Sequence, residues 1–300
     1  MSGVTVSIDP HVHSDDSYDG HEPIELILEH ASEIGLDAVV ITDHDVIGES
    51  KRAAEIADEY GLIGIPGVEV STAHGHLLAV GVDRMPPRRK PYAETVAWIH
   101  DHGGVAIVPH PFQRSRHGVR QRNIPVPAEA ETAAGDRADG GVAVGDAADA
   151  VGEVDEVDAV EVFNAWLFTG YRNRRARRFA ADHDYPGVAA SDAHHLEYVG
   201  RAYTDVEIAD RDSITAVTAD DVLDAIRNGT TSVDGRRAPI RMAAKHYVGA
   251  AGRKTGYYAA TGASRGAAAA TRGAADLVST VRVAIAQGAH RAARVLSWMT

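Results

Sequence analysis

The sequence predicts an α/β protein in which strands and helices alternate and the strands close into a barrel of the TIM type. Short apolar runs recur along the chain, and most are separated by a segment with helical periodicity. Polar residues follow nearly every run at its C-terminal end. A barrel brings all these ends around one mouth, whereas an open sheet gathers site residues at one switch point, so a barrel explains the pattern better. Seven strands are expected, at 4–9, 37–42, 62–70, 76–81, 105–109, 158–163 and 187–191.

The first strand leads into the pair His11 and His13. Residues two apart in an extended segment point to the same side, so both imidazoles are expected to face one site, as a metal ion requires. A helical pattern follows over 23–34. The next strand, 37–42, is continuously apolar, as in a strand covered on both faces, and His44 comes soon after it.

The middle of the chain continues the alternation. Helical patterns over 50–60 and 91–102 precede the strands that lead to Glu69 and His110. His76 is the exception, because it begins its strand rather than following it.

The last two strands end at Asn164 and at Asp192 with His194. Singly, a side chain of this kind often caps a helix or satisfies a local hydrogen bond. Their joint occurrence at the ends of otherwise apolar strands favours a shared metal site. Helices are also expected at 171–183 and 219–228, with an extended segment at 200–206.

The composition limits the kind of site. The chain has no cysteine, so disulfide-linked partners and thiolate zinc sites are excluded, and a metal must be held by His, Asp, Glu, Asn or water. Such ligands favour manganese, zinc or iron. The sequence shows no signal-peptide pattern and no run of 18 apolar residues, so a cytoplasmic location is expected.

Charge and composition divide the chain into an expected barrel domain, 1–245, and a tail, 246–300. The net charge is −13, yet the tail holds seven Arg or Lys residues and one Asp. Within the barrel, 128–152 is acidic and poor in large apolar side chains, which predicts a flexible insertion. The Ala-rich tail has an amphipathic helical pattern and is expected to dock on the acidic body, with an anionic membrane surface or nucleic acid as alternative partners.

Seven motifs occur in a characteristic order: HVHSDDSYDG, ITDHD, GVEVS, HGHLLAVG, VPHP, EVFNA and SDAH. With them, the sequence resembles the PHP (polymerase and histidinol phosphatase) superfamily over about residues 4–206. The resemblance implies a distorted (β/α)7 barrel that binds two or three divalent ions and hydrolyses phosphoesters. In such a site a metal-bridged hydroxide would be the nucleophile.

The resemblance also implies which residues bind metal. By position, the first ion would take His11, His13 and Asp192 with bridging Glu69, the second Asp19, His44 and His194, and the third Glu69, His76 and His110. Asp15 or Asp16 is an alternative to Asp19, because the spacing in this motif varies within the family. His74 is the alternative to His76.

Other residues are expected to support the reaction. The carboxylates of Glu69 and Asp192 would balance the metal charge. Asp43 and Asp45, beside His44, would orient its ring or shuttle a proton, with helix capping as the alternative. Phosphate binding is expected first from Arg201, with Arg114 and Arg116 as further candidates, and a ligand or substrate contact from Asn164.

The predicted function is that of a stand-alone metal-dependent phosphoesterase. Its substrates would be nucleotides or short oligonucleotides, for example a 3′,5′-nucleoside bisphosphate or an RNA end. The alternatives are a small-metabolite phosphatase of the histidinol phosphatase type and a non-catalytic protein that binds nucleic acid or a membrane.

Overall fold

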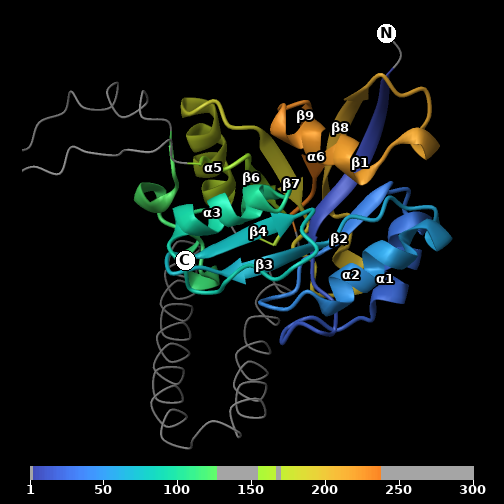
Figure 1. Ribbon diagram of the computed structural model, residues 1–300, viewed down its shortest axis with the longest axis horizontal. Coiled ribbons are helices and arrows are strands. Elements are labelled where there is room, and N and C mark those ends of the chain that lie inside the picture. Colours follow the sequence, from blue (N-terminus) through green and yellow to red (C-terminus); the bar gives the residue numbers. More distant parts are fainter. Residues whose placement is uncertain (1–2, 127–154, 167–169, 238–300) are drawn as a thin grey trace, which may run out of the picture. The chain divides into compact units, whose positions relative to one another are not determined.

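The computed structural model describes residues 3–126, 155–166 and 170–237 (Figure 1). The chain divides into two compact units, Met1–Ala238 and Pro239–Thr300, and the described residues all belong to the first. The predicted insertion at 128–152 and the predicted tail at 246–300 lie outside the described residues. No helix in the described ranges is long and apolar enough to span a membrane.

The described strands and helices follow the predicted alternation closely. The strands are β1 (Gly3–Val12), β2 (Ala38–Ile41), β3 (Gly67–Ser71), β4 (His76–Val80), β5 (Val105–Val108), β6 (Ala159–Asn164), β7 (Gly187–Ala190), β8 (Ala202–Ala209) and β9 (Thr231–Gly235). The α-helices are α1 (Ile24–Glu33), α2 (Gly48–Ile56), α3 (Tyr92–Asp101), α5 (Gly170–Asp182) and α6 (Ala219–Arg227). Short 3₁₀ turns are η1 (Ala57–Tyr60), η2 (Arg114–Arg116), η3 (Gln121–Asn123), η4 (Leu196–Tyr198) and η5 (Ile214–Ala216).

The prediction of one closed barrel is wrong for the described strands, which form two mixed sheets. One sheet has the order β2-β1-β8-β9 and the other β3-β4-β5-β6-β7. Strand β4 runs antiparallel to β3 because only residues 72–75 connect them, and a parallel crossover needs a dozen residues or more. Strand β8 pairs antiparallel with β1, which gives the first sheet a mixed order as well.

Side-chain and backbone bonds join the two sheets along β7. The Thr204 hydroxyl of β8 accepts from the Ala189 amide at 2.8 Å and lies 2.9 Å from the Ala189 carbonyl. The Thr231 hydroxyl of β9 donates to the Gly187 carbonyl at 2.8 Å. Beyond β7, the His13 amide donates to the Ala193 carbonyl at 2.8 Å. These bonds hold the end of β1 against the end of β7.

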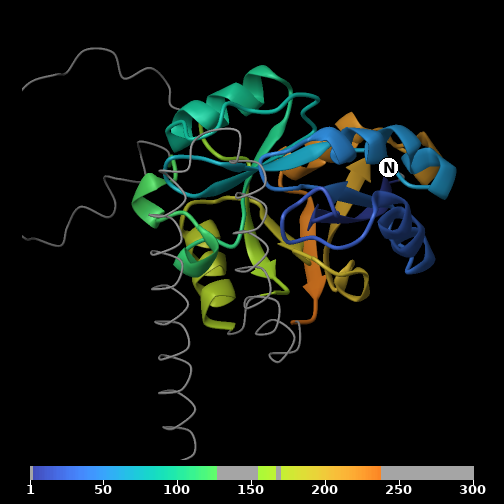
Figure 2. The same ribbon diagram turned by 90° about the horizontal axis from the view of Figure 1, so that it is seen from below.

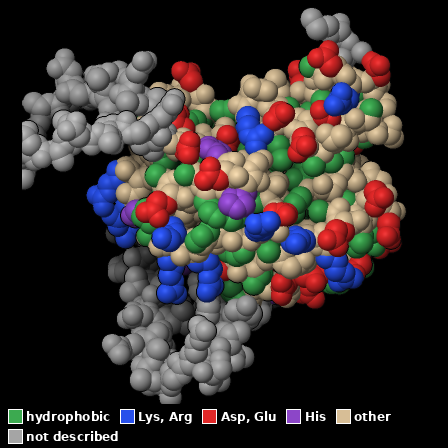
Figure 3. All heavy atoms as spheres, in the orientation of Figure 1, with side chains coloured by type: hydrophobic (Ala, Val, Ile, Leu, Met, Phe, Trp, Pro, Cys, Tyr) green, Lys and Arg blue, Asp and Glu red, His purple; other side chains and the backbone are tan. Residues whose placement is uncertain are grey.

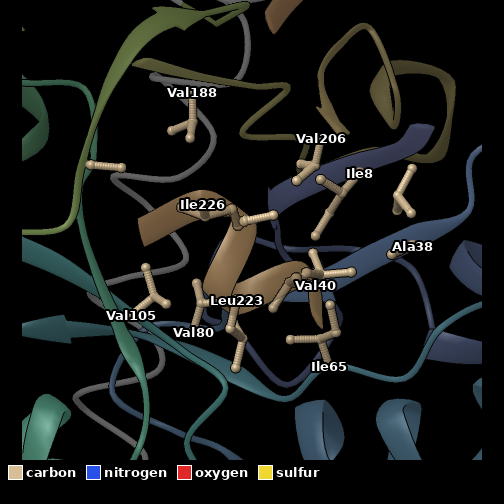
Figure 4. Close-up of a cluster of buried hydrophobic side chains, with 14 of the residues drawn as sticks. Ile8, Ala38, Val40, Ile65, Val80, Val105, Val188, Val206, Leu223 and Ile226 are labelled. Carbon is tan, nitrogen blue, oxygen red and sulfur yellow. The ribbon is translucent and has the colours of Figure 1, made fainter. Parts of the chain in front are cut away.

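The core lies between the two sheets and is closed by α6 (Figure 4). Alternate residues of a strand face opposite sides, so Leu78 and Val80 of β4 point into this core. Leu223 and Ile226 of α6 pack among them, at 3% and 0% exposure. A capping box at Thr218 and Asp221 fixes where α6 begins.

The opposite face of the second sheet packs against helices. Leu77 and Ala79 of β4 belong to this outer cluster, together with Val96 of α3 and Phe179 of α5. Figure 2 shows α3 and α5 beside this sheet, while α1 and α2 cover the first sheet. Both faces of each strand in the second sheet are therefore buried, which explains the continuous apolar runs in the sequence.

One strand begins later than predicted, and one strand was not predicted. The strand expected over 62–70 begins only at Gly67, because Pro66 lacks an amide hydrogen, and Ile63 makes no more than an isolated bridge with Ala38. Strand β9 was not predicted, since it is short, polar and largely exposed and so has no apolar run.

Candidate metal centre

The ends of several strands bring nine His, Asp and Glu side chains together at one place. Four overlapping groups offer ligand atoms that lie within 4.8 Å of one another. The groups are His13, Asp19, His44 and His194; His11, His13 and Asp192; His11, Glu69 and His110; and His44, Glu69 and His76. These are the nine residues that the sequence predicts as metal ligands.

Glu69 of β3 lies at the centre of the cluster and is fully buried. Its Oε1 atom is 2.7 Å from His76 Nδ1 and 3.0 Å from His110 Nε2. Its Oε2 atom is 3.0 Å from His44 Nδ1 and 3.4 Å from the Nε2 atoms of both His11 and His13. One carboxylate thus faces five imidazoles.

The position of His76 follows from the direction of β4. Because β4 is antiparallel to β3, its first residue lies beside the last residue of β3, with Ser71 opposite His76. A histidine at the start of β4 therefore reaches the same edge as Glu69. His74, the alternative ligand, is exposed and accepts from the Tyr92 amide at 3.4 Å, away from the cluster.

Asp19 reaches the cluster from the turn after β1. Its Oδ2 atom is 3.4 Å from His44 Nε2 and 3.3 Å from His194 Nε2. Asp15 and Asp16, the alternative ligands, are both exposed. The structure therefore favours Asp19 among the three carboxylates.

The imidazole rings are in close contact and shielded from water. His13 is stacked on His194 with ring centroids 4.3 Å apart and lies 4.6 Å from His44. His11 Nε2 and His13 Nε2 are only 3.1 Å apart. If His11 Nδ1 carries the proton toward Glu161, its Nε2 atom is a bare acceptor beside a second imidazole nitrogen, an arrangement that a cation between them would stabilise.

The charges of the cluster alter the pKa values of its members. Although burial favours a neutral ring, Glu69 and Asp19 raise the pKa of His44 to about 10. Burial and the nearby rings of His194 and His44 lower the pKa of His13 to about 3. Burial opposes ionisation of Glu69, yet the rings of His76 and His44 hold its pKa well below the usual range. The centre therefore holds an anionic carboxylate among imidazoles of unequal basicity.

These observations fit divalent metal ions. The buried Oε2 atom of Glu69 makes no hydrogen bond within the described part of the chain, although three imidazole nitrogens lie within 3.4 Å of it. Buried polar atoms are normally paired or bind a metal, and imidazole nitrogens with carboxylate oxygens suit zinc, manganese and iron.

Glu161 of β6 connects three members of the site and is 1% exposed. Its Oε1 atom is 3.0 Å from His11 Nδ1. Its Oε2 atom accepts from the backbone amide of His110 and, at 2.8 Å, from Asn164 Nδ2. A carboxylate on Nδ1 fixes the tautomer in which Nε2 is the free ligand atom.

Two further buried carboxylates hold the backbone around the cluster. Asp9 accepts from the amides of Ser191 at 3.0 Å and Gly200 at 2.9 Å, and burial raises its pKa to about 6. Asp43 accepts from the Ser14 amide at 2.7 Å and from the Ser14 hydroxyl. Burial raises the pKa of Asp43 to about 7, although these hydrogen bonds act to lower it.

Asp43 and Asp45 do not act as caps of α2. The N-cap of α2 is Ile47, which makes no side-chain cap bond. Asp45 accepts instead from the Ser71 amide at 2.7 Å, and Arg88 is 3.6 Å away. Both carboxylates thus fix loops beside the cluster.

Asp192 is the member of the cluster that pairs with an arginine. Arg116 forms a two-pronged ion pair with it, one prong measuring 2.9 Å. Asn164 Nδ2 donates to Asp192 at 2.9 Å. Asp192 and His110 have positive φ angles of 54° and 28°, a conformation that is costly for these residues and typical of functional sites.

The other predicted phosphate-binding arginines lie elsewhere. Arg114 is exposed on η2. The Nε atom of Arg201 donates to the Arg237 carbonyl at 3.1 Å, and its guanidinium lies 5.7 Å from the centre of the Tyr198 ring. Neither arginine contacts the cluster, whereas Arg116 does.

The sequence did not point to Glu161 or Asp9, and it indicated Arg116 only together with Arg114. A charged residue inside an otherwise apolar strand was the available signal for Glu161 and Asp9. No such signal separates Arg116 from Arg114, because both lie in one polar loop and only its conformation decides which side chain points inward.

Comparison with known families gives two matches. Residues 9–118 match the family described as PHP domain, and residues 170–231 match the family described as PHP-associated. The first match contains His11, Glu69 and His110 of the cluster, and the second contains Asp192 and His194.

Two curated proteins are similar over part of the chain. An uncharacterized protein of Methanocaldococcus jannaschii is 31% identical over 86 residues, which is 29% of this chain and 50% of that protein. A phosphoribosyl 1,2-cyclic phosphate 1,2-diphosphodiesterase of Eggerthella lenta is 33% identical over 85 residues, which is 26% of this chain and 32% of that protein. The chain therefore spans half or less of the length of these relatives.

A solved structure has a similar fold. It is a two-domain protein from Bacteroides vulgatus that contains a predicted PHP-like metal-dependent phosphoesterase. The TM-score is 0.56 at 19% identity, with 78% of this chain and 66% of that chain covered.

Proposed function

Because the chain belongs to the PHP superfamily, we propose that it is a metal-dependent phosphoesterase that hydrolyses phosphate esters of nucleotides or short oligonucleotides. The observation that carries the proposal is the convergence of nine His, Asp and Glu side chains, eight of them buried, with Glu69 at their centre. The diphosphodiesterase among the relatives acts, by its name, on a phosphoribosyl cyclic phosphate, which supports a sugar phosphate ester as substrate.

Each group of side chains has a role in this proposal. His11, His13 and Asp192 would hold one ion, and Asp19, His44 and His194 a second. Glu69 would bridge between ions, with His76 and His110 on its other oxygen. Divalent ions such as manganese, zinc or iron would supply water activation and charge stabilisation at the phosphoryl group.

Arg116 is the residue best placed to bind a substrate phosphate. Its guanidinium reaches Asp192 at the edge of the cluster, with a side chain only 8% exposed. Arginine binds phosphate with two parallel hydrogen bonds, as it binds a carboxylate. We propose that Arg116 binds a phosphate oxygen of the substrate in place of Asp192, which would then be available to hold an ion.

The buried surroundings serve the same chemistry. Glu161 fixes the His11 ring, while Asp9 and Asp43 fix the loops that carry Ser191 and Ser14. Ligands held in this way need little reorganisation during the reaction, which lowers the barrier. A cytoplasmic location remains a prediction from the sequence.

An activity screen with manganese tests this function. The substrates are mononucleotides, a 3′,5′-nucleoside bisphosphate, short RNA, single-stranded DNA and histidinol phosphate, and the measurement is phosphate or nucleotide release. We expect turnover of one of the nucleotide substrates, and Glu69→Gln should reduce it by at least about 100-fold, since the central carboxylate is lost.

The control variant is Glu207→Gln, an identical change at an exposed position of β8. It should retain full activity. Preferential turnover of histidinol phosphate would replace the proposed substrate class with a small metabolite, and no turnover of any substrate would favour a binding protein.

A further inference from the structure

Arginines are concentrated in two segments of a chain that is acidic overall. Residues 114–122 contain four arginines and residues 170–178 contain five, and neither segment has an Asp or Glu. We use the name arginine track for four arginines of these segments and two from later in the chain. The track consists of Arg120, Arg122, Arg174, Arg178, Arg201 and Arg237.

The elements that carry the track are far apart in sequence but in contact with one another. Arg175 of α5 donates to Gln121 of η3 at 3.4 Å and lies 4.3 Å from the centre of the Phe112 ring, so the loop and the helix are in contact. At the start of α5, the guanidinium groups of Arg174 and Arg237 both approach Gly170, at 3.2 and 3.7 Å from the position that a Cβ atom would take there.

The track is also anchored to the catalytic cluster. Arg116, from the loop that carries Arg120, forms an ion pair with Asp192. Asn173 of α5 donates to the Asn164 carbonyl at 3.1 Å, and Asn164 in turn donates to Asp192. The first turn of α5 is therefore linked through Asn164 to Asp192, a residue of the proposed first metal position.

The track is rich in positive charge and contains no acidic residue. Within the described ranges, none of its six arginines forms an ion pair with a carboxylate, whereas Arg52, Arg211 and Arg227 on other surfaces each do. Five of the six are exposed, and Arg201 is partly exposed. Figure 3 shows one face of the described part, with Lys and Arg side chains gathered at its left and lower edges.

An aromatic ring accompanies the arginines. Tyr171, in the first turn of α5, is 57% exposed, and Arg172 lies 5.7 Å from the centre of its ring. Exposed aromatic rings among backbone-binding arginines are the features that bind single-stranded nucleic acids, because every base can stack on a ring. A compact phosphomonoester would reach Arg116 and leave the rest of the track without a partner.

We propose that the arginine track binds the phosphate backbone of a single-stranded oligonucleotide, placing one phosphate at the metal centre and its neighbours along α5 and the 114–122 loop. This inference rests on the proposed function, since it deepens the substrate class of the same site. The track supplies the local arginines that an acidic chain needs in order to hold a polyanion.

Direct binding separates this inference from the catalytic proposal. Fluorescence anisotropy is measured on the full chain carrying Glu69→Gln, with a labelled mononucleotide and with single strands of about 4 and about 12 nucleotides. We expect affinity to rise with length. Adding Arg174→Gln and Arg178→Gln should weaken binding of the longest strand about tenfold and reduce the slope of log K against log salt by about 1.4.

The matched control adds Arg52→Gln and Arg211→Gln, which remove the same charge from other surfaces, and should bind like the parent. Equal affinity for all lengths, equal weakening by both double variants, or tighter binding of a duplex than of a single strand would overturn the inference. Wild-type hydrolysis of mononucleotides without length preference would overturn it and leave the proposed function standing. Length-dependent binding without turnover would support the track and refute the catalytic proposal.

Discussion

Replacing Glu161 with Gln changes one atom in a fully packed position and should weaken the metal site without unfolding the chain. Glu161 accepts three hydrogen bonds, from His11, His110 and Asn164. Glutamine has a single oxygen and could keep the two donors on the Oε2 side. Its amide would then donate toward His11 Nδ1.

The expected magnitude follows from the tautomer of His11. An amide donor at Nδ1 favours the ring form that carries its proton on Nε2, the atom that faces Glu69, His13 and Asp192. A protonated Nε2 atom cannot bind a metal. Loss of such an orienting partner typically lowers metal affinity or activity about 10- to 100-fold, or about 1.4 to 2.7 kcal/mol.

Isothermal titration of the metal-stripped chain with manganese measures this effect. Glu161→Gln should raise the dissociation constant of one ion by that factor, and excess manganese should restore much of the activity. The exposed control Glu207→Gln should match the wild type. Unchanged metal affinity in a folded Glu161→Gln variant would refute the orienting role.

Two predictions concern stability. Leu223→Ala should lower the free energy of unfolding by about 2–5 kcal/mol in urea denaturation, because Leu223 is 3% exposed in the core under α6, whereas the exposed Leu26→Ala should cost about 0.5 kcal/mol or less. His100 lies 2.8 Å from Asp158, and that hydrogen bond, against partial burial, raises its pKa. The stabilisation is thus present below the unfolded pKa of about 6.5 and is lost as pH rises through the higher pKa of the folded state. His100→Gln should therefore lower the free energy of unfolding by on the order of 1 kcal/mol near pH 5.5 and by less near pH 9. An equal cost at both pH values would contradict this assignment.

The sequence predicted most elements of the fold but not their pairing. Apolar runs indicate buried strands, and these runs predicted the positions of β1 to β7. They do not indicate strand direction, so the antiparallel pairing of β4 with β3 and of β8 with β1 was missed. The short connection at 72–75 was the one local sign that β3 and β4 form a hairpin.

The site was easier to predict than the residues that support it. Ligand-type side chains at the C-terminal ends of strands that run in the same direction share one edge, and His76 joins them because it begins the antiparallel strand β4. Glu161 and Arg116 act through contacts with residues distant in sequence, at 150 and 76 positions. Such contacts depend on tertiary structure and leave no local pattern.

Metal removal tests the central claim most directly. The full chain is stripped with a chelator and shown to be metal-free, and hydrolysis of a single-stranded oligonucleotide is then followed as manganese is added back. The cluster around Glu69 predicts that the stripped chain is inactive and that activity returns saturably with more than one bound ion per chain. Full activity of the metal-free chain would contradict the account.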